Sequence, residues 1–288
     1  MKSDAELQHP APLPSATVVL LRDGREGLEI FLLERHGQSD VLGGAYVFPG
    51  GKVDRKDPEL TGRLDVDAAT LHKTLGEPEM DERTAAAVFV AAIREVFEET
   101  GVLFADDVGP DRANAAWKSL REGRGFDEVT AGLRLQVGGL VPWSRWVTPI
   151  IAGVVRKRFD ARFFIARVPG DQVAHHDDHE AVASLWRTPR AALQEYWDNR
   201  IALAPPQIMT LAALSRHADA ESAMAFARTR PPPRIAPVTW FEPNGDRVAC
   251  YPGDEGHPER ERAMPGPTRL YTRNNRFEPE GGFDALFG

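Results

Sequence analysis

Three apolar segments near the start of the chain have the composition of β-strands. Residues 16–22 are almost continuously apolar, which is typical of a strand buried on both faces. Asp23 and Gly24 supply turn residues, and residues 28–35 follow as the partner strand of a hairpin. After a glycine-bearing loop, residues 45–48 form a third short strand in this prediction. The pattern therefore predicts a sheet at the beginning of the domain.

The most regular helical pattern of the chain carries three glutamates on one side. At about 100° per residue, Glu95, Glu98 and Glu99 fall within an arc of roughly 100°. Gly101 supplies a C-terminal stop for this helix, and Asp81 is a candidate N-cap. A separate arc is apolar and makes the helix amphipathic; it holds Val88, Phe89, Ala92, Ile93, Val96 and Phe97.

The acidic stripe has a chemical and a structural interpretation. Like charges three and four residues apart on a helix repel each other by a few tenths of a kcal/mol per pair, and no lysine lies between them. Three carboxylates on one face match the oxygen ligands that a hard divalent cation such as Mg²⁺ or Mn²⁺ prefers. Taken alone, such a stripe is more often a solvated acidic helix face, so residues elsewhere decide between the two.

A Phe-Pro-Gly-Gly turn at residues 48–51 favours the metal-binding interpretation of the acidic stripe. Together with the acidic helix it resembles the Nudix box, in which a glycine and a glutamate precede an Arg-Glu-apolar-x-Glu-Glu-x-Gly-apolar motif. The expected first glutamate is Asp57, and 36 residues separate it from Arg94 where the pattern has seven. The matching positions are Gly51, Arg94, Glu95, Val96, Glu98, Glu99, Gly101 and Val102.

The resemblance implies a fold and a division of the chain. We expect an α/β protein: a Nudix-type α/β/α sandwich with a mixed sheet, an insertion in the box and a C-terminal helical plus β extension. The Nudix hydrolase domain would span 12–197, with the insertion at 58–80. Residues 198–288 would form C-terminal helices and a short β tail packing on that domain.

The resemblance also implies roles for the residues of the box. Glu95, Glu98 and Glu99 would bind the metal, and Arg94 would orient a carboxylate of the box rather than touch the substrate. The acid that holds Arg94 is left open by the insertion. Asp57 is the candidate by count, and two replacements are Asp54 and Glu82 at the helix start.

Residues 31–51 resemble the motif that precedes the box in coenzyme A diphosphatases. This resemblance implies that Arg35, Gly50 and Gly51 contact the substrate. The motif normally carries a second arginine within its loop, where this chain has Gln38-Ser39-Asp40. The position of the insertion resembles that of the insertion in the peroxisomal coenzyme A diphosphatase branch of Nudix proteins and its bacterial relatives.

Cations and two tryptophans follow the box in the predicted strands. Arg145, Arg158 and Arg162 lie on elements expected near the box, where a diphosphate would need positive charge. Their alternative role is that of solvated strand ends. Trp143 and Trp146 could stack on a purine base, although a core role is expected for at least one.

The polar loop at 171–180 supplies a candidate general base. By resemblance to Nudix enzymes, Glu180 occupies the position of a glutamate that reaches the metals or acts as base before a strand ending in tryptophan. A nearby histidine is the alternative, because neutral imidazole suits that role near pH 7.

The remaining pattern predicts further helices, strands and a tail. We expect the last residues, 277–288, to be disordered. Predicted helices cover 111–124, 127–135, 207–217 and 220–228, and predicted strands cover 161–168, 181–187, 238–241, 247–251 and 268–272.

Composition and charge limit the partners. The net charge of −8 argues against a surface that coats nucleic acid. The single cysteine, Cys250, excludes an internal disulfide and indicates a reducing, cytoplasmic environment. No apolar run is long enough to cross a membrane. The resemblance also allows a homodimer, although no segment marks an interface.

These expectations combine into one function and two rivals. We expect a metal-dependent hydrolase of a P–O–P linkage, with coenzyme A or acyl-coenzyme A as the first-choice substrate by resemblance. The products would be 3′,5′-ADP and (acyl-)phosphopantetheine. The first rival is a Nudix enzyme for NADH, ADP-ribose, a dinucleoside polyphosphate or capped RNA. The second is a non-catalytic nucleotide sensor, which usually lacks one of the metal-binding glutamates.

Overall fold

The computed structural model describes residues 11–37, 43–150, 157–177 and 181–288. Within these ranges eight strands form one mixed sheet in the order β3-β2-β1-β6-β5-β8, with β4 paired to β1 and β7 paired to β2. Strands β1 and β6 run parallel, as do β5 and β8, and the other pairs are antiparallel. The strands are β1 Leu13–Gly24, β2 Gly27–Arg35, β3 Tyr46–Val47, β4 Gly50–Lys52, β5 Val141–Val147, β6 Phe159–Arg167, β7 Ala181–Arg187 and β8 Arg234–Ile235.

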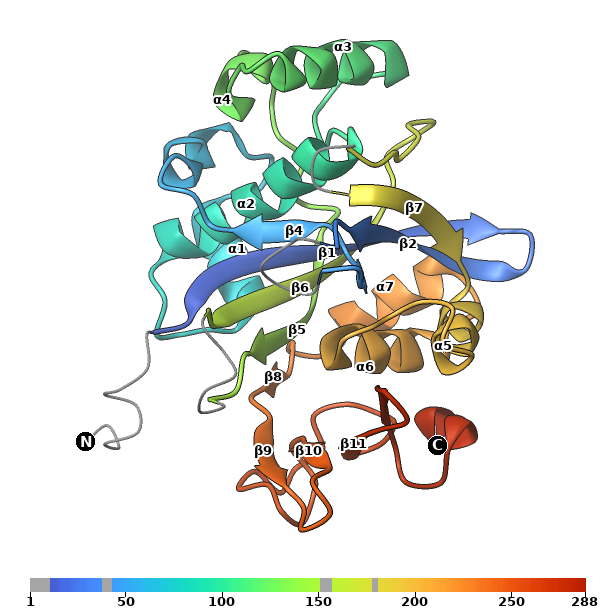
Figure 1. Ribbon diagram of the computed structural model, residues 1–288. Coiled ribbons are helices and arrows are strands. Elements are labelled where there is room, and N and C mark those ends of the chain that lie inside the picture. The colour runs from blue at the N-terminus through green and yellow to red at the C-terminus, as the bar shows by residue number, and fades with distance from the viewer. Residues whose placement is uncertain (1–10, 38–42, 151–156, 178–180) are drawn as a thin grey trace.

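Helices cover both faces of this sheet (Figure 1). One side carries α1 (Ala68–Leu75), α2 (Glu82–Thr100), α3 (Pro110–Arg121) and α4 (Phe126–Val129), with α3 outside α2. The other side carries α5 (Pro189–Trp197), α6 (Pro205–Leu214) and α7 (Ala220–Arg228). The predicted three-layer α/β/α arrangement is confirmed.

The sequence of β1 explains why both faces of the sheet are covered. Val18 and Leu20 point into the core under α2, whereas Val19 and Leu21 point into the core under α6. Successive side chains of a strand alternate between the two faces. A continuously apolar strand therefore needs a helix layer on each side, as its composition predicted.

The insertion packs onto the core under α2. It contains two 3₁₀ turns, Asp57–Glu59 and Thr61–Arg63, followed by α1. Four leucines of the insertion are each 9% exposed or less. Each such leucine contributes roughly 1.5–3 kcal/mol by leaving water. They are Leu60, Leu64, Leu71 and Leu75.

The predicted helix over residues 127–135 is wrong beyond Val129. The backbone groups of residues 130–135 form hydrogen bonds with residues of the insertion instead. The Arg63 guanidinium donates to the carbonyl oxygens of Thr130 and Leu133. The backbone N–H of Leu135 donates to the Arg63 oxygen at 2.8 Å, and its carbonyl accepts from Asp65 N–H at 2.9 Å. A long-range partner therefore outweighs the local helical preference.

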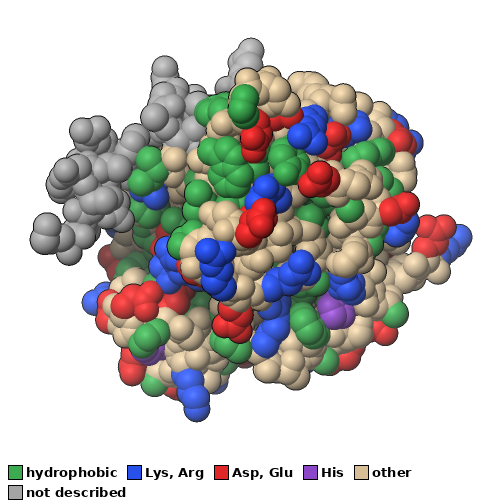
Figure 2. Space-filling model, turned by 90° about the horizontal axis from the view of Figure 1, so that it is seen from below, with side chains coloured by type: hydrophobic (Ala, Val, Ile, Leu, Met, Phe, Trp, Pro, Cys, Tyr) green, Lys and Arg blue, Asp and Glu red, His purple; other side chains and the backbone are tan. Residues whose placement is uncertain are grey.

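The tail forms a second sheet of four strands within the described residues, in the order β12-β11-β10-β9 (Figure 1). It packs on the helices of the second face through Tyr251, Leu270 and Leu286. Acidic and basic side chains are interspersed over this end of the molecule (Figure 2). Its strands are β9 Val238–Phe241, β10 Arg247–Cys250, β11 Arg269–Arg273 and β12 Arg276–Glu278.

The expectation that residues 277–288 are disordered is wrong. Phe277 belongs to β12, and a 3₁₀ helix spans Phe283–Phe287. Tyr196 on α5 donates to the Phe277 carbonyl at 2.9 Å. Arg216 donates to the carbonyl of Phe287 at 3.0 Å. Contacts with residues far away in the sequence hold this polar end in place.

Candidate active site

Helix α2 carries the acidic stripe in its last two turns. It begins after Asp81, whose carboxylate accepts the Thr84 N–H at 2.9 Å, and it ends at Gly101 with φ of 73°. Both predicted caps are confirmed. The residues between them bury the apolar arc against the sheet and leave the side chains of Glu95 and Glu98 15% and 34% exposed. A set of carboxylates is thus partly open to solvent beside a rigid core.

Arg94 ties this stripe to the residue on the far side of the insertion. Its Nε donates to Asp57 Oδ1 at 2.8 Å, and its Nη2 donates to Asp57 Oδ2 at 3.1 Å. Its Nη1 donates to Glu95 Oε1 and Glu98 Oε2, both at 2.8 Å. One guanidinium nitrogen therefore brings two carboxylates of the stripe together, as the box resemblance implied.

The structure selects Asp57 among the three acids considered for Arg94. Asp57 is fully buried and accepts the Asp54 N–H at 2.6 Å. Asp54 and Glu82 are exposed, and the Asp54 carboxylate accepts from Lys56 N–H instead. The box is thus closed in space although 36 residues separate its halves in the sequence.

Electrostatics keeps Arg94 charged. Burial alone would lower the pKa of its guanidinium. The hydrogen bond with Asp57 and the charges of Glu95, Asp57 and Glu98 oppose burial and raise the pKa overall. The residue is therefore a permanent cation among three acids, a role that a neutral donor could not fill.

The Gly-Gly turn is packed between strand β1 and the stripe so closely that neither position can carry a side chain. The Gly50 N–H donates to Glu99 Oε2 at 3.0 Å. A β-carbon on Gly51 would lie 2.4 Å from the Glu95 carboxylate, and one on Gly50 would lie 2.4 Å from the Ala16 carbonyl oxygen. The turn can approach the carboxylates only because these side chains are absent.

The polar loop after β6 lies at the C-terminal end of α2. Arg35, Glu99 and Asp177 line one small pocket together with Leu33, Val47 and Ala181. The Arg35 Nε is buried and has no hydrogen-bond partner within the part of the chain that the structure describes. The structure thus brings Arg35 to the stripe, next to an aspartate that the sequence analysis did not single out. Glu180, the predicted base, lies outside the described residues.

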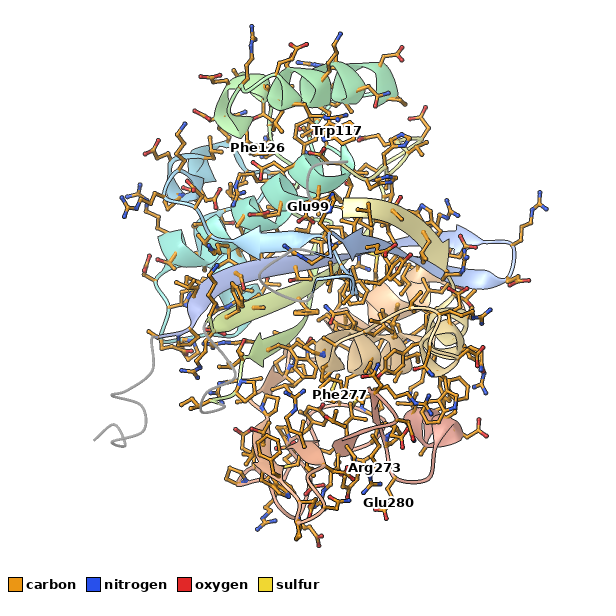
Figure 3. The ribbon with its side chains drawn as sticks, in the orientation of Figure 1. Glu99, Trp117, Phe126, Arg273, Phe277 and Glu280 are labelled. Atoms are coloured by element: carbon orange, nitrogen blue, oxygen red, sulfur yellow. The ribbon has the colours of Figure 1, made fainter. Side chains whose placement is uncertain are left out.

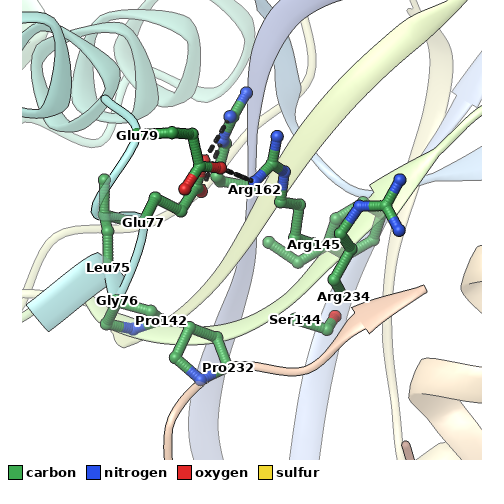
Figure 4. A pocket seen from close by; sticks show the side chains of 11 residues that line it. Leu75, Gly76, Glu77, Glu79, Pro142, Ser144, Arg145, Arg162, Pro232 and Arg234 are labelled. Atoms are coloured by element: carbon green, nitrogen blue, oxygen red, sulfur yellow. Dashed lines mark hydrogen bonds and ion pairs between the residues drawn. The ribbon is translucent and has the colours of Figure 1, made fainter. Parts of the chain in front are cut away.

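Two of the other predicted substrate contacts lie in a separate ion cluster (Figure 4). Arg162 is 4% exposed and pairs with Glu77 at 2.6 Å. Arg145 pairs with Glu77 at 2.7 Å and with Asp160 at 2.8 Å. Both arginines line a cavity of about 210 Å³ that contains no residue of the stripe. The structure therefore does not bring them together with the glutamates.

The remaining candidates lie away from the glutamate stripe or in the core. Arg158 Nε donates to the Thr148 carbonyl at 3.1 Å and lines neither of these pockets. Trp143 and Trp146 are 1% and 4% exposed, so both belong to the core under α6. Neither indole has a face available for stacking on a base.

The donor set fits a hard divalent cation. Glu95, Glu98 and Glu99 offer oxygen ligands from one helix, and the glycine turn packs directly beside them. No three acidic, histidine or cysteine side chains among the described residues already converge on one point. Arg94 lies between Glu95 and Glu98 and engages both. Because the stripe has neither thiolate nor imidazole, its chemistry favours a hard divalent cation over a softer metal.

An α/β/α sandwich whose helix presents these glutamates to a Gly-Gly turn defines a Nudix hydrolase. A solved Nudix hydrolase from Alicyclobacillus acidocaldarius has a similar fold, with a TM-score of 0.57 and 26% identity. The match covers 75% of this chain and 96% of that one. The expected fold class and enzyme class are confirmed.

The family can be named more narrowly. Residues 10–214 match the model of the NUDT19 Nudix domain, and the chain belongs to this family. It is 28% identical over 280 residues to the Xenopus laevis acyl-coenzyme A diphosphatase NUDT19, covering 80% of this chain and 72% of that protein. The human protein of the same name is 27% identical over 273 residues, with 80% and 72% covered.

No helix in the described residues combines the length and the apolar character needed to cross a bilayer.

Proposed function

We propose that this chain hydrolyses the diphosphate linkage of coenzyme A or acyl-coenzyme A, giving 3′,5′-ADP and (acyl-)phosphopantetheine. Two relatives that are similar to this chain over 80% of its length carry the name acyl-coenzyme A diphosphatase, which supports this substrate class. The observation that supports the proposal is the contact of Asp57 with Arg94, because it joins the two halves of the box-like pattern across the insertion.

Each residue of the site has a separate role in this proposal. Glu95, Glu98 and Glu99 hold Mg²⁺ or Mn²⁺, which supplies neutralisation of the diphosphate charge and activation of the attacking water. Arg94 is a positioning residue that sets the orientation of Glu95 and Glu98.

Substrate contacts come from the surroundings of the stripe. The Gly50-Gly51 turn lets phosphate oxygens approach the backbone. The buried Arg35 Nε, which has no hydrogen-bond partner among the described residues, lies in the pocket beside Glu99, where an anionic oxygen would be its natural acceptor. Glu180 remains our proposed general base, with a loop histidine as the alternative.

The test is a turnover assay with product identification by mass. The panel contains coenzyme A, acetyl- and long-chain acyl-coenzyme A, NADH, ADP-ribose and diadenosine polyphosphates, each with Mg²⁺ or Mn²⁺. We expect 3′,5′-ADP from the coenzyme A compounds. Glu98→Gln should reduce the rate at least about a hundredfold, since charge stabilisation in the transition state is lost. Glu82→Gln, an exposed glutamate in the first turn of the same helix, is the matched control and should retain wild-type turnover.

Other outcomes would reassign the substrate or the function. Turnover of NADH or ADP-ribose alone would keep the metal chemistry and reject coenzyme A as substrate. Tight nucleotide binding without turnover of any compound would favour the nucleotide sensor.

A further inference from the structure

The last turn of α2 has its carbonyl groups satisfied from three different elements. A helix leaves its last four carbonyl oxygens without partners inside the helix. Here Gly101 N–H donates to Phe97 oxygen at 2.9 Å, His175 N–H to Thr100 oxygen at 3.0 Å, and Asp177 N–H to Glu99 oxygen at 3.1 Å. The polar loop is thereby attached to the turn that carries two of the three metal-site glutamates.

The fourth carbonyl is satisfied by a side chain of α3. Trp117 Nε1 donates to the Glu98 carbonyl oxygen at 3.1 Å. In Figure 3 the Trp117 side chain lies between α3 and the end of α2 that carries Glu99. Its ring also packs on Gly101, where an added β-carbon would lie 3.0 Å from the indole. A single side chain thus contacts both the end of the catalytic helix and its stop residue.

The same tryptophan reaches the polar loop. Its ring stacks on His175, with centroids 6.3 Å apart and planes inclined by 20°. Arg121, one turn further along α3, lies over the indole at 5.2 Å from its centroid. Arg121 also approaches Asp177, with Nε 3.7 Å from Oδ1. Trp117 therefore touches both the helix end and the loop, and Arg121 contacts Trp117 and the loop.

We propose that Trp117, assisted by Arg121, is a positioning residue for the metal site. It fixes the last turn of α2, which carries Glu98 and Glu99, relative to the loop that carries Asp177, so that Glu99 stays beside Asp177 in their shared pocket. Trp117 touches neither substrate nor metal in this account and acts through Glu98. The inference rests on the proposed function for its kinetic consequences, whereas its structural consequence can be measured without turnover.

The experiment compares Trp117→Ala and Trp117→Phe with a matched tryptophan. Trp197 on α5 is also half-buried beneath an arginine, Arg276 at 4.1 Å, and packs on Phe283 of the tail, so Trp197→Phe is the control. For each full-length variant we would measure kcat and KM for the substrate, the half-saturating Mg²⁺ concentration, the Tm, and amide hydrogen exchange in peptides covering residues 171–177.

The expected result separates positioning from general stability. Trp117→Phe keeps an aromatic ring but loses the indole N–H and with it one neutral hydrogen bond. We therefore expect kcat to fall about fivefold with KM nearly unchanged. Trp117→Ala should lower kcat further, raise the Mg²⁺ requirement and speed exchange in 171–177. Trp197→Phe should leave kcat, the Mg²⁺ requirement and this exchange at wild-type values.

Two results would overturn the proposal. One is a folded Trp117→Ala variant with wild-type exchange in 171–177. The other is a lowered Tm with no change in kcat or Mg²⁺ requirement, which a merely structural role predicts. If the wild type turns over no coenzyme A compound, the proposed function fails, and the exchange measurement alone decides the positioning role.

Discussion

At the scale of single residues, the site depends on one cation shared by three acids. Glu95 and Glu98 belong to the proposed metal site. The fully buried Asp57 carboxylate lies outside it and accepts from Arg94 and from the Asp54 N–H. A buried guanidinium without a partner is costly. Asp57 therefore fixes Arg94, and Arg94 in turn fixes the two glutamates.

Replacing Asp57 by asparagine should weaken the fold and the site together. The amide cannot form the charge-assisted bidentate contact with Arg94, so we expect the free energy of unfolding in urea to fall by about 2 kcal/mol. Asp54→Asn is the control, because Asp54 is exposed and makes no contact with Arg94. Equal destabilisation by the two substitutions would show that Asp57 has no special role.

At the scale of elements, the insertion is a structural part of the domain. Glu77 follows α1 and is 6% exposed. The Arg162 guanidinium donates to both of its oxygens, at 2.9 and 2.6 Å. This buried pair joins the insertion to β6, at the opposite end of α2 from the glutamates.

Glu77→Ala should therefore destabilise far more than removal of its neighbour Glu79. The Arg162 side chain is 5% exposed and would lose its bidentate partner while keeping Asp160 at 3.1 Å. We expect a loss of about 3 kcal/mol in urea unfolding, the low end for a broken buried pair. Glu79→Ala should cost less than about 1 kcal/mol, since the Glu79 side chain is 64% exposed. Similar values for the two variants would contradict the role given to Glu77.

Local signals predicted elements well, and long-range contacts explain the failures. Strand β7 and helix α7 have the predicted bounds. Helix α7 combines a helical period with a local N-cap at Asp219, so its start is encoded in neighbouring residues. The Arg162 ion pair could not be predicted, since Glu77 lies 85 residues away in the sequence. Trp117 was missed because its partner is a backbone carbonyl, which carries no sequence signal.

At the scale of the whole molecule, charge on the second face links stability to pH. His217 lies at the end of α6, with its ring against Phe226 and Trp143. Burial lowers the pKa of His217, Arg230 and Arg216 lower it further, and Asp219 opposes them. On the first face, burial alone would raise the pKa of Asp160. The hydrogen bond with Arg145 and the charges of Arg162 and Arg145 outweigh burial and lower the pKa overall.

These shifts predict a loss of stability in two steps on acidification. As the pH falls below about 6.5, His217 becomes protonated in the unfolded chain before it does in the folded protein. The free energy of unfolding therefore decreases on acidification. Below about pH 4 the contribution of Asp160 is lost as pH falls through its lowered folded pKa. Urea midpoints between about pH 7 and pH 5 should decline less in His217→Gln than in the wild type. An unchanged decline in the variant would exclude His217 as its source.

The central claim is that a box split by an insertion closes into a site that cleaves a diphosphate. The most direct test is hydrolysis of an acyl-coenzyme A with Mg²⁺ in water enriched in heavy oxygen, followed by mass spectrometry. We predict 3′,5′-ADP and acyl-phosphopantetheine, with one heavy oxygen in one of the two and none in the other. Release of unlabelled or labelled inorganic phosphate with an intact P–O–P linkage would mean attack on the 3′-phosphate instead and would contradict the account.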